Sequence, residues 1–180
     1  TALYERERTG FGRVVEIAML EATYPVLATN LTSMHNLDGQ QPPRLGNSHP
    51  ARSSGPYGVY ETSDGHVAII CVRDAHWERL LAILDREDLK DHPHFIDQKS
   101  RGENPEAVDA LVSAWTRRHT KAQVAEILRE NTIPVAPVRT LPEVNQDPHM
   151  HTRGMLHHMD HPQLGDVVLP HSPLRFHGED

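Results

Sequence analysis

The stretch "PYGVYETSDGHVAIICV", residues 56–72, decides the fold class of this chain. Apolar and polar side chains alternate from Tyr57 onward, which is the pattern of a strand with one buried face. Asp64 and Gly65 form a dipeptide that favours the tight turn of a hairpin. The run at 67–72 is apolar throughout and predicts a buried return strand. The segment therefore predicts a β-hairpin.

Three helices are predicted after the hairpin, because apolar residues recur there at the spacing of one helical face. Asp74 is the candidate N-cap of the first helix, and Asn104 is the candidate cap of the second. Thr120 with Gln123 forms a capping box for the third. The apolar positions are Trp77, Leu80, Leu81 and Leu84; Val108, Leu111, Val112 and Trp115; and Val124, Ile127 and Leu128. These patterns predict a small α/β domain that is built on this hairpin and on a second hairpin around Gly165, with the two tryptophan helices packed on the sheet.

Segments on both sides of this domain carry patterns of their own. Residues 1–8 are typical of the charged end of a helix that stops at the following glycines. "RVVEIAM" (13–19) is rich in β-branched residues and predicts a short buried strand, whereas "LEATYPVLATNLTSM" (20–34) is apolar nearly all round and predicts a buried helix with a kink at Pro25. The remaining predictions are an extended segment at 133–140, a short helix at 141–148 and a second hairpin around Gly165.

Length and charge limit the function classes. A chain of 180 residues with 37% hydrophobic residues can bury one modest core. The formal charge of -7 and the scattered basic residues argue against nucleic acid as a partner, because phosphate binding needs a basic face. No apolar run approaches the roughly 18 residues of a membrane span, and the amino terminus is charged rather than signal-like. We expect neither nucleic acid nor membrane as a partner.

Cysteine and histidine content raises the questions of redox chemistry and metal binding. The single Cys71 lies in an apolar run, allows no internal disulfide and fits a reducing cytoplasm, so we interpret it as a buried, inert thiol. Fourteen histidines are present, and five of them fall in "HMHTRGMLHHMDH" (149–161). Gly154 and Pro162 break any helix that could align these side chains, and no HExxH or CxxC spacing occurs. We therefore predict no metal site.

The segment "LGNSHPARSSG", residues 45–55, is rich in glycine, serine and proline and precedes the hairpin directly. Long connections of this composition in a compact domain are usually functional loops or linkers. Two hypotheses follow from the residues alone. The segment either covers a reaction site or only joins two parts of the chain.

Taken in order, the motifs resemble those of the family III CoA-transferases, the CaiB/BaiF family. They are "YERERTGFGRVVEIAMLEA", "RLGNSHP", "PYGVYETSDGHVAI", "IPVAPVRTLPEVNQDPH", "RGM", "HP" and "LPHSPLRFHG", and together they cover essentially the whole chain. One departure is Arg13, which stands where the family has glutamine after its TGxG turn.

The resemblance implies a fold and an assembly. Members of the family are about twice this long, with a Rossmann-like large domain built from both ends of the chain and a smaller α/β domain, and two subunits interlock as a homodimer. The expected division is a large-domain segment at 1–40, a small α/β domain with a loop at 41–140, and a segment at 141–180 that returns to the large domain. The chain then corresponds to the carboxyl-side portion of such a cytoplasmic enzyme.

The resemblance also implies the chemistry and the site. The family's nucleophilic aspartate would lie in sequence preceding Thr1, so no catalytic residue is expected in this chain. An aspartyl intermediate would carry the acyl group and then CoA, with acyl-CoA and a carboxylic acid as substrates and no metal. The loop that covers the site would correspond to Arg44, Gly46, Asn47, Ser48, His49 and Gly55. Met19 matches a position that lies against CoA, although core packing explains a methionine there equally well.

Two other functions stay open. The same fold supports α-methylacyl-CoA racemisation, in which a histidine and an aspartate exchange a proton at the acyl α-carbon. An acidic residue near Asp74 would support that histidine, whereas the R-x-G-N-x-H-P form favours transfer. The third hypothesis is a non-catalytic fragment or interaction module, which would have no turnover.

Overall fold

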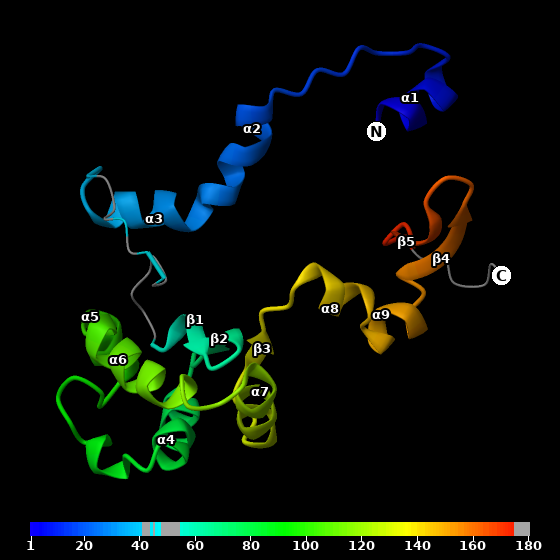
Figure 1. Cartoon of the computed structure of the whole chain (residues 1–180). Helices are drawn as coiled ribbons and strands as arrows, with labels where there is room; N and C mark the ends of the chain where they lie inside the picture. Colours follow the sequence, from blue (N-terminus) through cyan, green and yellow to red (C-terminus); the bar gives the residue numbers. More distant parts are fainter. Residues whose placement is uncertain (41–43, 45, 48–54, 175–180) are drawn as a thin grey trace.

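The computed structural model describes residues 1–40, 44, 46–47 and 55–174 (Figure 1). Its central element is a three-stranded antiparallel sheet in the order β1-β2-β3. The strands are β1 (Tyr57–Thr62), β2 (Gly65–Ile70) and β3 (Val135–Pro137). Thr62 pairs with Gly65 across the turn, so the predicted hairpin is confirmed. The extended segment predicted at 133–140 supplies the third strand.

Helices cover one face of this sheet. Tyr60, Val67 and Ile69 point into a core that also contains Trp77 and Trp115, which are 2% and 6% exposed. The main helices are α4 (Asp74–Ile83), α6 (Pro105–Thr116) and α7 (Lys121–Glu130), and they are joined by η2 (Glu87–Leu89) and α5 (Gln98–Glu103). The predicted α/β domain and its tryptophan packing are therefore confirmed. The hairpin around Gly165, which the sequence predicts in the same domain, instead forms a separate two-stranded sheet.

Two of the three N-cap residues predicted from the sequence are the N-caps in the structure. Thr120 and Gln123 form the predicted capping box of α7, and Asn104 precedes Pro105 at the start of α6. The N-cap of α4 is Arg73, whereas we had predicted Asp74. The reason is that the Asp74 carboxylate accepts a hydrogen bond from a buried arginine and leaves the helix end uncapped by a side chain.

The amino-terminal segment departs from the sequence prediction. Helix α1 (Ala2–Thr9) ends at Gly10 with a φ of 75°, as expected. The strand predicted at 13–19 is wrong, because residues 11–18 have no regular structure and Val14 is 98% exposed. A strand needs a neighbour to bond its main chain. No such neighbour exists in the described part of this chain.

The helix predicted at 20–34 forms but is not buried. It consists of α2 (Met19–Thr23), the 3₁₀ turn η1 (Tyr24–Leu27) and α3 (Ala28–Asn36), and the tighter turn occurs at the predicted kink, Pro25. None of these three elements contains a buried residue. Figure 1 shows why, since this helical run lies apart from the domain and the described part of the chain does not cover it.

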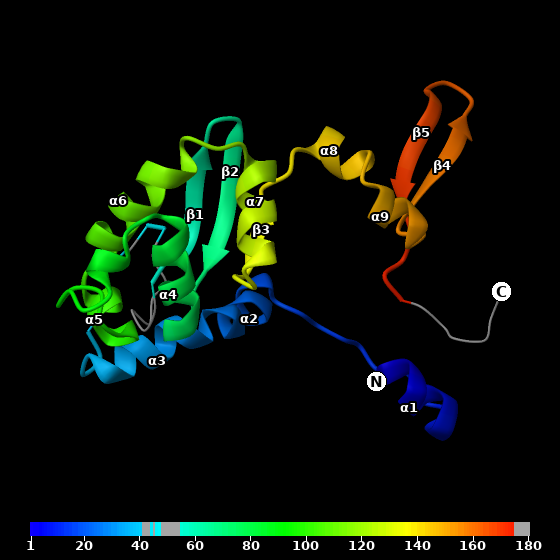
Figure 2. The same cartoon turned by 90° about the horizontal axis from the view of Figure 1, so that it is seen from below.

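The carboxyl-side segment also extends from the domain (Figure 2). It contains α8 (Leu141–Asn145), α9 (Pro148–Thr152) and the predicted second hairpin, β4 (Leu156–His161) with β5 (Gly165–Pro170). Helix α9 was not predicted. The whole chain has 13337 Å² of accessible surface, against about 8,800 Å² for a compact monomer of this mass. The excess of about 4,500 Å² measures how far both flanking segments reach. The three-part domain division stays a prediction.

Candidate functional site: the anchored loop

Asn47 binds the edge of the sheet. Its side-chain nitrogen Nδ2 donates to the carbonyl oxygen of Val59 at 2.8 Å, and its Oδ1 accepts from the Val59 amide at 2.8 Å. Both groups of Val59 lie on the free side of β1, because main-chain groups alternate in direction along an antiparallel strand. The Asn47 amide therefore replaces a neighbouring strand at this position.

Gly58 makes room for that contact. A Cβ atom built on Gly58 would lie 2.5 Å from Nδ2 of Asn47 and 2.9 Å from its Cγ. Separations under 3.0 Å are not tolerated, so a side chain here would expel the Asn47 amide from the strand edge. Glycine inside a strand often marks such a close approach.

Arg101 holds the other end of the loop. The side chain is fully buried, with Nε donating to the Gly55 carbonyl oxygen at 3.0 Å and Nη1 donating to that of Phe95 at 2.9 Å. Nη2 donates to Asp74 at 2.6 Å, and the guanidinium lies 5.3 Å from the ring centroid of Trp77. Every arm of the arginine therefore has a partner, as a buried charge requires.

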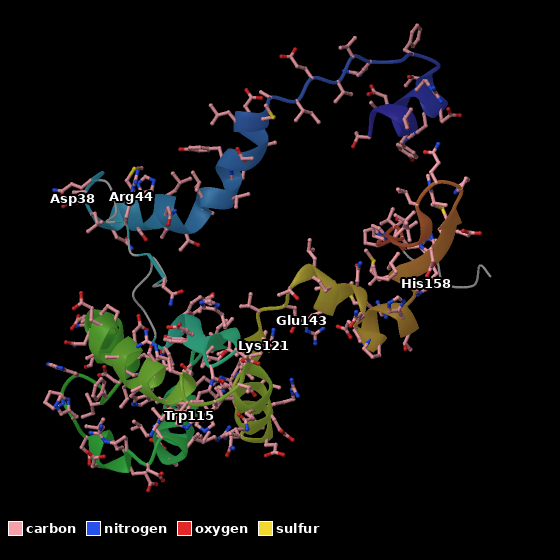
Figure 3. The ribbon with its side chains drawn as sticks, in the orientation of Figure 1. Asp38, Arg44, Trp115, Lys121, Glu143 and His158 are labelled. Carbon is pink, nitrogen blue, oxygen red and sulfur yellow. The ribbon has the colours of Figure 1, made fainter. Side chains whose placement is uncertain are left out.

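The predicted site residues are only partly brought together. Asn47 and Gly55 are both tied to the region of β1, and Gly46 precedes Asn47 with a φ of 57°. Arg44 is exposed beyond the end of α3 (Figure 3). Ser48 and His49 lie outside the described residues.

Met19 is not near these loop residues within this chain. It is the first residue of α2 and is 86% exposed. Figure 1 places the start of α2 and the end of α3 at opposite ends of the helical run, and the loop follows α3. A joint site for Met19 and the loop would need other parts of the protein.

The sequence analysis did not identify two residues that hold the loop, Gly58 and Arg101. Gly58 carried a signal, since glycine in the middle of an alternating strand indicates a close backbone approach. Arg101 carried none, because it occurs in the polar stretch "QKSRGEN" (98–104), where arginine is normally exposed.

A charged network connects the domain to the segment that follows it. Lys121 Nζ lies 2.5 Å from Glu143 Oε1, and the Lys121 amide donates to Asp64 in the hairpin turn (Figure 3). Glu143 also accepts from the Thr140 amide as part of the capping box of α8. The hydrogen bond from Lys121, with those from Thr140, lowers the pKa of Glu143 to about 2.

Cys71 and the histidines are the remaining groups that could react or bind a metal ion. Cys71 is fully buried, and burial raises the pKa of its thiol to about 12, which leaves it protonated and unreactive. In the described ranges, no group of three or more histidine, cysteine or carboxylate side chains is placed to hold a metal ion. His158 instead faces Asp166 at 2.9 Å across the second hairpin. Within the same residues, no helix is long and apolar enough to cross a membrane.

Comparisons with known proteins agree with the motifs. The sequence matches CoA-transferase family III over residues 1–180. It is 35% identical to a succinyl-CoA:mesaconate CoA-transferase of Haloarcula marismortui over 97% of this chain and 43% of that protein. It is 27% identical to an acetyl-CoA:oxalate CoA-transferase of Acetobacter aceti, covering all of this chain and 44% of that protein. A solved CaiB/BaiF family protein from Brucella suis aligns with a TM-score of 0.79 and 30% identity, over 99% of this chain and 45% of that one.

These findings define an α/β protein of the CaiB/BaiF fold. The chain belongs to CoA-transferase family III. It spans less than half the length of the relatives it matches, so the segments that extend from its domain correspond to parts of a larger structure in those relatives.

Proposed function

We propose that the protein transfers coenzyme A from an acyl-CoA to a carboxylic acid. The observation that carries the proposal is the match to a succinyl-CoA:mesaconate CoA-transferase along 97% of this chain. Succinate, mesaconate and oxalate, named among the substrates of the relatives, are all short dicarboxylic acids. A short dicarboxylate is therefore the proposed acceptor class.

The proposed reaction proceeds through an aspartate in sequence that precedes Thr1. Its carboxylate oxygen attacks the thioester carbonyl, the C–S bond breaks, and a mixed anhydride and CoA thiolate result. The thiolate then attacks the aspartyl carbonyl and releases the donor acid, which leaves an aspartyl-CoA thioester. The acceptor carboxylate repeats these steps in reverse order and leaves with CoA. Covalent catalysis of this kind divides one acyl transfer into easier steps.

Water must be kept from these intermediates, since an anhydride or thioester that meets water is lost to hydrolysis. We assign that role to the loop of Arg44, Gly46, Asn47, Ser48, His49 and Gly55. The anchoring of Asn47 and Gly55 to the β1 region supports this assignment, because it gives the loop a fixed base. We assign Met19 to contact with CoA, and its 86% exposed side chain is available for that contact.

The proposed assembly is an interlocked homodimer whose large domain includes the flanking segments of this chain. Support comes from the surface excess and from the large apolar side chains that stay exposed between Leu3 and Leu27. Exposed apolar area of this extent is typical of a surface that is covered in the whole protein.

Incubation of the full-length protein with succinyl-CoA and a panel of dicarboxylic acids tests the proposal. Mass spectrometry should detect the CoA ester of at least one acceptor, and hydroxylamine should trap an aspartyl thioester on the protein. Replacement of His49 or shortening of 48–55 should slow transfer and raise the share of succinyl-CoA lost to hydrolysis. Absence of any acceptor ester across the panel would overturn the proposed function, and an unchanged share of hydrolysis in the loop variants would favour the linker hypothesis.

A further inference from the structure

The Asn47 side chain bonds the strand through both of its polar atoms, which leaves one N–H and one oxygen lone pair of the amide. Its carbonyl oxygen and its amide nitrogen are both bound to Val59, at 2.8 Å each. The amide of an asparagine can bind a strand edge with one donor and one acceptor, as a second strand would. The asparagine of the R-x-G-N motif therefore makes a contact with β1 that fixes its own position.

Gly58 takes part in the same contact, although ten residues of chain separate it from Asn47. The Asn47 side chain lies against the Cα of Gly58. Even the methyl group of an alanine at position 58 would overlap it, because a Cβ there would lie 2.5 Å from Nδ2 of Asn47. The φ angle of Gly58 is not in the left-handed region, so the backbone itself would accept alanine. The three atoms nearest to a Cβ at this position all belong to Asn47.

We infer that Asn47 and Gly58 form a clamp that positions the start of the active-site loop on β1. The chain leaves this strand edge at Asn47 and returns at Gly55, where Arg101 holds the carbonyl oxygen. The two anchors together fix where the loop begins and where it ends. The clamp itself rests on the observed contacts, and its effect on catalysis rests on the proposed CoA transfer.

Substitution of both clamp residues, alone and together, tests the inference in the full-length protein. The variants are Asn47→Ala, Gly58→Ala and the double variant. Asn131→Ala serves as a matched control, because this exposed amide also bonds a main-chain carbonyl, and Arg129→Ala is a control at an exposed position of α7. Amide hydrogen exchange at Val59 reports the clamp directly, and the ratio of transfer to hydrolysis with succinyl-CoA reports the loop.

Each clamp variant should raise exchange at Val59 by at least about tenfold, since its amide loses its bond and lies at a strand edge. The double variant should resemble the single ones, because both changes remove the same contact. Transfer relative to hydrolysis should fall in all three and in neither control. Unchanged exchange at Val59 in Asn47→Ala, or effects of the two changes that sum, would overturn the clamp.

An unchanged ratio of transfer to hydrolysis in variants that have lost protection at Val59 would overturn the positioning role. If the unmodified protein transfers no CoA, the proposed function fails by itself. The exchange measurements then still decide whether the clamp exists, so the two failures are distinguishable.

Discussion

Replacing Arg101 with methionine should destabilise the domain by about 4 kcal/mol, a large part of the stability of a typical domain. The two bonds from the buried guanidinium to the carbonyl oxygens of Gly55 and Phe95 account for about 3 kcal/mol or more, because bonds to a charged group contribute about 1.5–3 kcal/mol each. The pair with Asp74 adds less than about 1 kcal/mol, since that carboxylate is 54% exposed. Methionine keeps most of the packing volume against Trp77.

Urea unfolding followed by tryptophan fluorescence measures this loss, because Trp77 and Trp115 both lie in the core. Arg129→Met, at an exposed position of α7, should change the free energy of unfolding by less than about 0.5 kcal/mol. Arg101→Lys should recover only part of the loss, as lysine cannot bond three partners in a plane. A loss below about 1.5 kcal/mol in Arg101→Met would refute the argument that the buried bonds hold the loop end.

Three further outcomes follow from the structure. At pH 8 the Cys71 thiol should react with a thiol reagent about 1000-fold more slowly in the native chain than in urea, because its pKa of about 12 leaves almost no thiolate. Equal rates in the two conditions would contradict its burial. Glu143, whose pKa is lowered to about 2, should stabilise the fold fully above its ordinary pKa near 4.5 and lose this effect as pH falls towards 2. The difference in urea midpoint between wild type and Glu143→Gln should shrink over that range, and a constant difference would exclude the ion pair with Lys121. The 180-residue chain alone should turn over no thioester and should self-associate through its apolar helix at 19–34. Any turnover would contradict the proposed position of the catalytic residues, and a monomer in a size measurement would contradict the role of that helix.

The sequence predicted those elements whose partners are close along the chain. The hairpin around Gly65 and the capping box at Thr120 follow from residues a few positions apart, and both were confirmed. Helix burial was predictable only where the chain itself supplies the covering surface. The apolar run at 20–34 has the pattern of a buried helix, yet the described part of the chain does not cover it, so pattern and exposure disagree.

The candidate site was predictable in part, and for a similar reason. Motif order indicated the loop and its family, but spacing could not show that Asn47 bonds Val59 or that Arg101 reaches back to Gly55. Those contacts span 12 and 46 positions, so they form only when distant segments meet in the folded domain. A buried arginine in a polar stretch gives no local signal, because its partners are main-chain oxygens that every residue carries.

The occupied outer side of β1 has a consequence for how other chains can add to the three-stranded sheet. Asn47 bonds Val59 and Thr116 Oγ1 donates to the Glu61 carbonyl oxygen at 2.7 Å, so the outer side of β1 is occupied, while Pro137 removes a donor from β3. An open edge is the usual template on which strands of other chains add. Strands of other chains should therefore not add at the outer side of β1, and self-association should use the apolar helical run at 19–34 instead.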